Sequence, residues 1–189
     1  NSEAQLREKM SLFWHGHFAC RIPNSFFQQE LLHIIRTNAL GSFADMLKAV
    51  SKSPAMLQFL NNQQNRKQKP NENFAREVME LFTMGRGNYT ENDVKEASRV
   101  LTGWRWKGDN PDGSYNSYFD SDWHDENNKQ FSAFYNNKVI TGKTGAAGAT
   151  ETDELLTMIL DTQEAAKYLV RRLYRWFIYY VIDASAETN

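Results

Sequence analysis

The stretch that decides the fold reads Asn71-Glu72-Asn73-Phe74-Ala75-Arg76-Glu77-Val78-Met79-Glu80-Leu81-Phe82-Thr83-Met84-Gly85. Its apolar members recur at helical spacing, which predicts a central helix from about residue 72 to residue 84 that Gly85 ends. Beside this apolar stripe lies an ordered polar set, Asn73, Glu77 and Glu80. A helix that only has to pack carries a plain solvated face, so polar groups in register on a buried helix predict a site.

Helices are expected on both sides of this stretch. Apolar residues recur at intervals of three and four over 6–17, 27–38, 43–50, 94–101, 155–160 and 166–181, and Pro54 begins another short helix. Ser42, Thr90 and Thr150 each start a capping pattern, with an acidic residue three positions later. The amide-rich run 61–71 has no apolar periodicity and is interpreted as a loop.

The composition changes after Trp104. Turn-forming residues at 109–114 and short runs at 115–119, 131–135 and 139–141 predict an antiparallel β excursion over residues 105–142. We therefore expect one mainly α domain over residues 1–189 with a small antiparallel β-hairpin insertion. Its core should form where the first, central and last helices pack together.

Composition excludes several classes of protein. An apolar share of 41% with 5 Trp, 8 Tyr and 12 Phe predicts a well-filled globular core. A net charge of -1 provides no long-range field for nucleic acid, so we expect no nucleic-acid partner. A single cysteine, Cys20, excludes an internal disulfide framework. No apolar run is long enough for a transmembrane segment, and residues 1–9 lack the apolar stretch of a signal peptide.

Two long motifs carry a resemblance to a known family. The first is Trp14-His15-Gly16-His17-Phe18, and the second is the stretch 71–85 followed by Asn88-Tyr89-Thr90-Glu91 and Leu101-Thr102-Gly103-Trp104. The chain resembles, from about residue 6 to residue 180, an uncharacterised bacterial family catalogued as domain of unknown function 1800.

This resemblance implies an exported, extracytoplasmic protein that is longer at both ends, and it brings no established activity. The chain is accordingly expected to be a central fragment of a longer protein, in which missing segments leave apolar surface exposed.

The two histidines of the first motif are candidate metal ligands. Residues two apart share a face in a strand, but in a helix they diverge by roughly 200 degrees. The helical stripe therefore points His17 inward and His15 elsewhere, so at most one of them joins a site. The alternative is a buried His17 that donates to a carbonyl or a carboxylate.

Glu77 and Glu80 lie three residues apart, so both carboxylates can face a metal held between helices. The alternative is a structural polar network of Asn73, Arg76, Glu77, Glu80 and His15, in which Arg76 pairs with Glu80 at the i, i+4 spacing. His124 lies in the irregular excursion and can complete a divalent-metal set of His17, Glu77, Glu80 and His124, or stand as an ordinary loop histidine.

Two functions of different class follow. The favoured one is a non-catalytic exported scaffold or binding module for an unknown protein or polymer partner, with a buried His, Glu and Arg network. The alternative is a metal-assisted enzyme, a hydrolase in which the converging ligands hold an ion that activates water. The sequence does not decide whether the protein is an enzyme.

Overall fold

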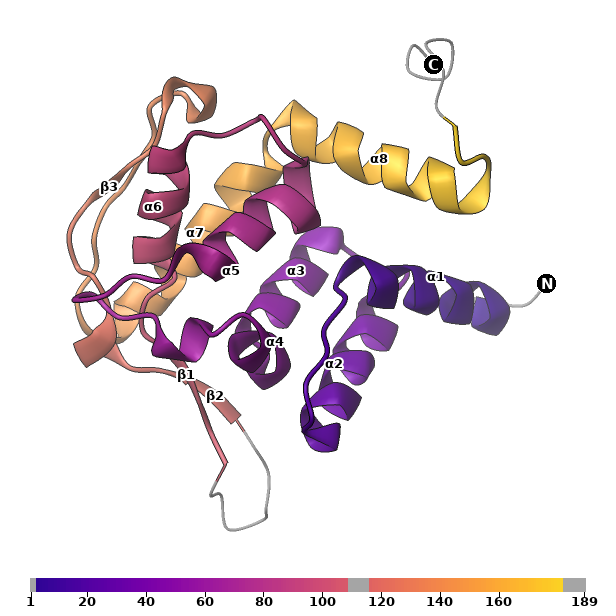
Figure 1. Cartoon of the computed structure of the whole chain (residues 1–189), viewed down its shortest axis with the longest axis horizontal. Coiled ribbons are helices and arrows are strands. Elements are labelled where there is room, and N and C mark those ends of the chain that lie inside the picture. The colour runs from indigo at the N-terminus through magenta and orange to yellow at the C-terminus, as the bar shows by residue number, and fades with distance from the viewer. Residues whose placement is uncertain (1–2, 109–115, 182–189) are drawn as a thin grey trace.

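The computed structural model describes residues 3–108 and 116–181 and is mainly helical (Figure 1). Its N-terminal half comprises α1 (Glu3–His17), α2 (Ser25–Asn38), α3 (Phe43–Lys52), α4 (Pro54–Phe59) and the 3₁₀ turn η1 (Asn62–Gln64). The expected caps are present, since the hydroxyls of Ser42 and Ser53 accept from the backbone N–H groups of Asp45 and Met56.

The predicted central helix divides into two parts. Glu72–Glu77 is α-helical (α5), whereas Val78–Met84 is a π-helix (η2). A π-helix has a wider turn than an α-helix, so residues three apart no longer share a face. This explains why Leu81, which was expected on the apolar face, is exposed. In the polar set Asn73 is exposed, and Glu77 and Glu80 are half-buried.

The β excursion is confirmed in outline and corrected in detail. Strands β1 (Trp104–Lys107) and β2 (Asn116–Phe119) form one antiparallel pair, and β3 (Lys129–Gln130) and β4 (Val139–Ile140) form another. The expected strand at 131–135 is wrong, because Ala133–Tyr135 is a 3₁₀ turn (η4) followed by Asn136 and Asn137 at positive φ. Tyr115 and the turn formers 109–114 lie outside the described residues.

The remaining elements are helices and 3₁₀ turns. They are α6 (Glu91–Val100), the 3₁₀ turns η3 (Ser121–Trp123) and η5 (Gly145–Gly148), α7 (Ala149–Leu160) and α8 (Gln163–Phe177). Thr90 and Asp93 form the expected capping box of α6. The cap expected at Thr150 is wrong, because α7 already begins at Ala149 and thereby places Glu151 inside its first turn, where the carboxylate is buried.

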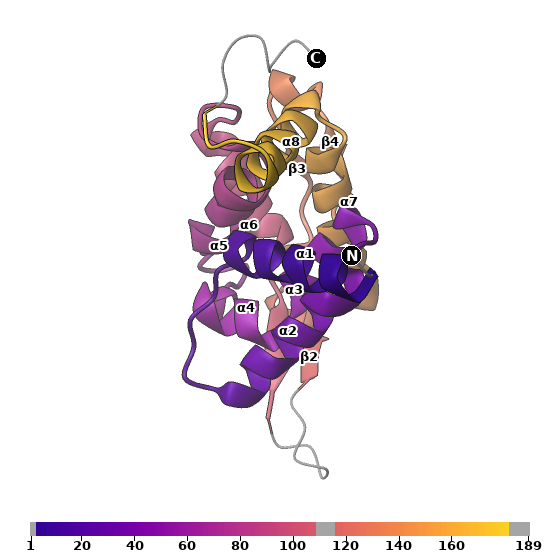
Figure 2. The ribbon, with the colours of Figure 1, turned by 90° about the vertical axis from the view of Figure 1, so that its right-hand side faces the viewer.

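The core draws buried residues from each helix from α1 to α8, with α1 and α8 on the same side of the molecule (Figures 1 and 2). The first, central and last helices all contribute to this core, as expected, but the last one contributes only Ala165 as a buried member. Ala165 of α8 is buried, but Val170, Trp176 and Tyr180 are exposed, because α8 packs on η2 and α7 and then runs past them. No helix of the described residues is both long and apolar enough to cross a membrane.

Candidate functional site

Five helical segments, α1, α4, α5, η2 and α8, meet at a small pocket of about 250 Å³. His17 is the last residue of α1, Glu77 is the last of α5, and Arg172 reaches in from α8. The wall between these polar groups is apolar and consists of Gly16, Ala19, Phe59, Leu60, Leu81 and Phe82. The structure thus brings together two residues of the predicted metal set and adds one that sequence reasoning missed.

The end of η2 fixes the geometry of this pocket. The hydroxyl of Thr83 donates to the carbonyl of Val78, five residues earlier, at 2.6 Å, and Gly85 ends the element at φ +74. The last carbonyls of a helix have no partner within it. Two of them are satisfied by neighbouring helices, because His17 Nε2 donates to Phe82 O at 2.9 Å and the Tyr168 hydroxyl donates to Leu81 O at 2.8 Å.

His17 is neutral, and one of its ring nitrogens can accept a hydrogen bond. A carbonyl can only accept, so the bond to Phe82 assigns the proton to Nε2 and leaves Nδ1 as an acceptor. Nδ1 is buried and has no hydrogen-bond partner in the described part of the chain. Burial, followed by the positive charge of Arg172, lowers the pKa of His17 to about 4, and the bond to Phe82 opposes this shift.

The other two polar groups of the pocket carry opposite charges. Burial, followed by the neighbouring carboxylate of Glu80, raises the pKa of Glu77. The Arg172 guanidinium lies 5.7 Å from the centre of the Tyr168 ring and donates to its hydroxyl at 3.1 Å. The formal charges of Glu77 and Arg172 cancel, and the neutral His17 adds an acceptor.

The structure separates the other members of the predicted polar network. Glu80 pairs with Arg86 and accepts from the Tyr89 hydroxyl at 2.9 Å. Arg76 pairs with Glu91 at 2.7 Å and Glu72 at 3.4 Å, in place of the expected pair with Glu80. The side chain of Asn73 donates to Leu60 O at 3.3 Å. His15 is exposed, as the helical stripe predicted.

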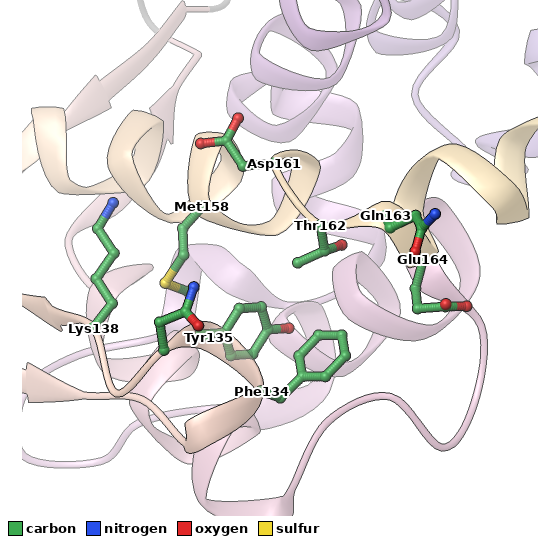
Figure 3. A pocket seen from close by; sticks show the side chains of 9 residues that line it. Phe134, Tyr135, Lys138, Met158, Asp161, Thr162, Gln163 and Glu164 are labelled. Carbon is green, nitrogen blue, oxygen red and sulfur yellow. The ribbon is translucent and has the colours of Figure 1, made fainter.

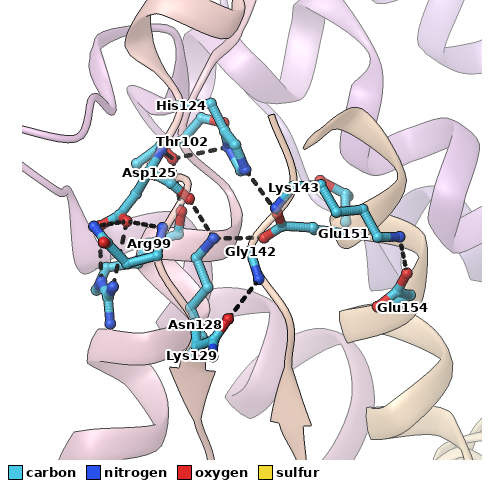
Figure 4. A network of polar contacts seen from close by, with 12 residues as sticks. Arg99, Thr102, His124, Asp125, Asn128, Lys129, Gly142, Lys143, Glu151 and Glu154 are labelled. Atoms are coloured by element: carbon cyan, nitrogen blue, oxygen red, sulfur yellow. Dashed lines mark hydrogen bonds and ion pairs between the residues drawn. The ribbon is translucent and has the colours of Figure 1, made fainter. Parts of the chain in front are cut away.

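His124, which follows η3, lies in a separate buried network with Glu151 of α7 (Figure 4). Its Nδ1 lies 3.0 Å from Thr102 O, and its Nε2 lies 3.1 Å from the Glu151 carboxylate. Glu151 also accepts from Lys129 Nζ at 2.5 Å and from the Lys143 backbone N–H at 2.6 Å. Glu151 and Lys129 are both 0% exposed, so this is an ion pair in the interior.

The electrostatics of this network stabilise the charged forms. Burial alone would raise the pKa of Glu151, but the donors His124, Lys129 and Lys143 hold it below the ordinary value. Burial likewise opposes ionisation of Asp125, whose pKa is nevertheless held at about 2 by bonds from Arg99 and Asn127. Every charge of the network thus has a partner, which is typical of a polar network that stabilises the fold.

The four predicted metal ligands therefore lie in three places: His17 and Glu77 at the pocket, Glu80 with Arg86, and His124 with Glu151. Across residues 3–108 and 116–181, no group of three or more His, Cys, Asp or Glu side chains is arranged to hold a metal ion. Sequence spacing missed Lys129 and Glu151 as partners, because they are 22 residues apart and meet only through the fold.

A larger pocket of about 620 Å³ lies between η4 and the corner from α7 to α8 (Figure 3). Two of the hydroxyls that line it, those of Tyr135 and Thr162, each already lie 3.6 Å from Met84 Sδ. Among the residues that line it, no buried side-chain polar atom lacks a hydrogen-bond partner, so it is a weaker candidate than the His17 pocket.

Comparison with known proteins identifies the family and no activity. The family described as a protein of unknown function (DUF1800) matches residues 1–188. No curated protein and no solved structure matches the chain. Because the match covers nearly all 189 residues, the chain belongs to the DUF1800 family.

Proposed function

We propose that this chain is a non-catalytic binding module, and that the His17 pocket receives a hydroxyl-rich, uncharged group such as one sugar unit of a polymer. The observation that carries the proposal is the Nδ1 atom of His17. This residue is buried, with 3% of its surface exposed, and Nδ1 has no hydrogen-bond partner within the described residues. A buried acceptor without a partner is costly, and a bound ligand that donates to it removes the cost.

The charges of the pocket favour an uncharged ligand. Glu77 accepts hydrogen bonds, Arg172 donates them, and their formal charges cancel. A hydroxyl can donate one hydrogen bond and accept two, so it suits both kinds of neighbour. The apolar residues Phe59 and Leu81 are 37% and 46% exposed, and they offer surface for the C–H groups of a sugar ring.

The pKa of His17 supports binding over catalysis. A general base works best when its pKa lies near the operating pH, and a pKa of about 4 makes His17 a weak base at neutral pH. The network around Glu151 then serves as the structural part of the module, because its charges are paired and buried.

Calorimetric titration of the full chain with a panel of neutral trisaccharides tests the proposal. We expect saturable binding that Glu77→Gln and His17→Gln each weaken by about tenfold or more, because each loses one group that contacts the ligand. His15→Gln is the matched control, since His15 lies two residues from His17 on the same helix and is exposed. Absence of binding across the panel would overturn the proposal.

The second candidate is the metal-assisted hydrolase, which the same two side chains favour. His17 and Glu77 line one pocket, and imidazole and carboxylate are common ligands of a catalytic divalent ion. Elemental analysis by mass spectrometry of the purified protein decides between the candidates. Stoichiometric metal that both Glu77→Gln and His17→Gln abolish supports the hydrolase and contradicts the sugar site.

The family resemblance also leads us to propose that the protein works outside the cytoplasm, with a polymer or a protein as its partner and without nucleic acid. Fractionation of the bacterium that produces it tests this location. Recovery of the protein in the cytoplasmic fraction alone would contradict it.

A further inference from the structure

The amide-rich loop 61–71 is more tightly tied to the fold than its sequence suggests. Arg66 and Lys69 form an isolated antiparallel bridge, and the Lys69 N–H donates to Arg66 O at 2.8 Å. The backbone of Lys67 is held as well, because its N–H donates to Trp123 O at 2.8 Å. The loop is therefore closed on itself and attached through Lys67 to η3 of the β excursion.

Two fully buried asparagines, Asn62 and Asn65, attach this loop to the end of α6 and the residue after it. The side chain of Asn62 donates to Leu101 O at 3.2 Å. The side chain of Asn65 donates to Ser98 O at 2.8 Å and accepts from the Asn71 N–H, also at 2.8 Å. A surface loop held in this way is preorganised, so a ligand does not have to order it on binding.

The loop and η3 enclose a groove of about 630 Å³, a size typical of ligand sites. It is lined by Gln64, Arg66, Lys69, Pro70, Asn71, Glu72 and Trp123. Arg66 and Arg105 lie over the Trp123 ring, at 5.4 Å and 4.0 Å from its centre, so the guanidinium groups are held in place by stacking.

The groove carries uncompensated positive charge. Arg66, Lys67 and Lys69 have no carboxylate within ion-pair distance among the residues that the structure describes. The nearby acids have other partners, because Glu72 lies 3.4 Å from Arg76 and Asp120 lies 3.1 Å from Arg105. An anionic group that enters the groove therefore meets cations without first displacing an internal pair.

We infer that this groove binds an acidic sugar, one uronate unit of a polysaccharide. The carboxylate would pair with Arg66 and Lys69, the Gln64 amide suits a hydroxyl, and Pro70 provides apolar surface for the sugar ring. Nucleic acid is disfavoured, since the chain has a net charge of -1 and this basic cluster is short.

The experiment is calorimetric titration of the full chain with trigalacturonate and with the neutral galactose trisaccharide of the same length. We expect trigalacturonate to bind, and its affinity to fall by about tenfold between about 50 mM and about 500 mM NaCl because salt screens exposed charges. Arg66→Gln and Lys69→Gln should each weaken binding by about tenfold. Lys9→Gln is the control, because Lys9 is exposed on α1, which contributes no residue to this groove.

Equal affinity for the neutral trisaccharide at this groove, or full affinity in both groove variants, would overturn the inference. Stronger binding of inorganic phosphate or of a single-stranded DNA oligomer, abolished by the same variants, would overturn it in favour of those anions. Binding to this groove does not depend on the His17 pocket, so trigalacturonate binding that survives His17→Gln separates this inference from the proposed function. Urea unfolding of each variant shows whether it is folded.

Discussion

At the scale of single residues, His17 links the site to the pH dependence of stability. Its pKa is about 4 in the folded chain and 6.5 ordinarily, so the unfolded chain binds the proton more readily. Stability from this group is fully present above pH 6.5 and is lost as the pH falls through 4, which amounts to on the order of 3 kcal/mol. Urea unfolding between these pH values should show this loss in the wild type and not in His17→Gln.

The matched variant for this measurement is His15→Gln, whose side chain is exposed two positions away on α1. Its pH dependence should follow that of the wild type. An unchanged pH dependence in His17→Gln would contradict the assignment of a neutral, buried imidazole at this position.

Glu151 gives a second prediction at the residue scale. Glu151→Gln removes the charge that compensates the fully buried Lys129, so we expect a loss of about 3–5 kcal/mol in the free energy of unfolding. Glu154→Gln is the comparison, because the Lys143–Glu154 pair is partly exposed and is expected to contribute less than about 1 kcal/mol. Urea unfolding of both variants measures the difference. A similar loss of unfolding free energy in the two variants would contradict the larger contribution of the buried Lys129–Glu151 pair.

These residues also show what spacing can and cannot predict. Helical periodicity correctly placed His17 inside and His15 outside, because orientation about one helix is a local property. It wrongly paired Arg76 with Glu80, and it did not reveal Lys129 and Glu151. Those partners are chosen by tertiary packing, which no local pattern records.

At the scale of elements, the π-helix η2 is the feature that builds the pocket. Thr83→Val removes a buried hydroxyl that donates to Val78 O at 2.6 Å and leaves the side-chain volume nearly unchanged. We expect the free energy of unfolding to fall by about 1–2 kcal/mol, since a buried carbonyl loses a donor. Thr157→Val, at an exposed position of α7, should change it by less than about 0.5 kcal/mol.

Equal effects of the two threonine variants in thermal or urea unfolding would contradict this role of Thr83. The sequence predicted a helix over this stretch but not its π geometry. The spacing of the apolar residues fits an ordinary α-helix, and His17 and Tyr168, which bond the last carbonyls of η2, are far from it in the sequence.

At the scale of the whole molecule, the fold class follows from the sequence while the packing partners of α8 do not. Its apolar face was clear from periodicity, but the sequence does not say what covers it. In the structure Trp176 and Phe177 contact Phe13 of α1, and residues 178–181 are exposed. The predicted single domain is compatible with this arrangement and stays a prediction.

Unfolding experiments test that single domain. The buried hydrophobic residues form one cluster that includes members from α1 to α8, so we expect one cooperative transition in urea. Tryptophan fluorescence and far-ultraviolet circular dichroism should give the same midpoint. Two separated transitions would instead indicate that the β excursion, or α8, unfolds independently.

The most direct test of the central claim is a nuclear magnetic resonance spectrum of the His17 ring nitrogens, recorded on histidine-labelled protein during titration with the neutral trisaccharides. The account predicts a neutral ring at pH 7 with its proton on Nε2, and a shift of the Nδ1 resonance as a ligand hydroxyl begins to donate to it. A charged ring, a proton on Nδ1, or an Nδ1 resonance that no trisaccharide moves would contradict the account.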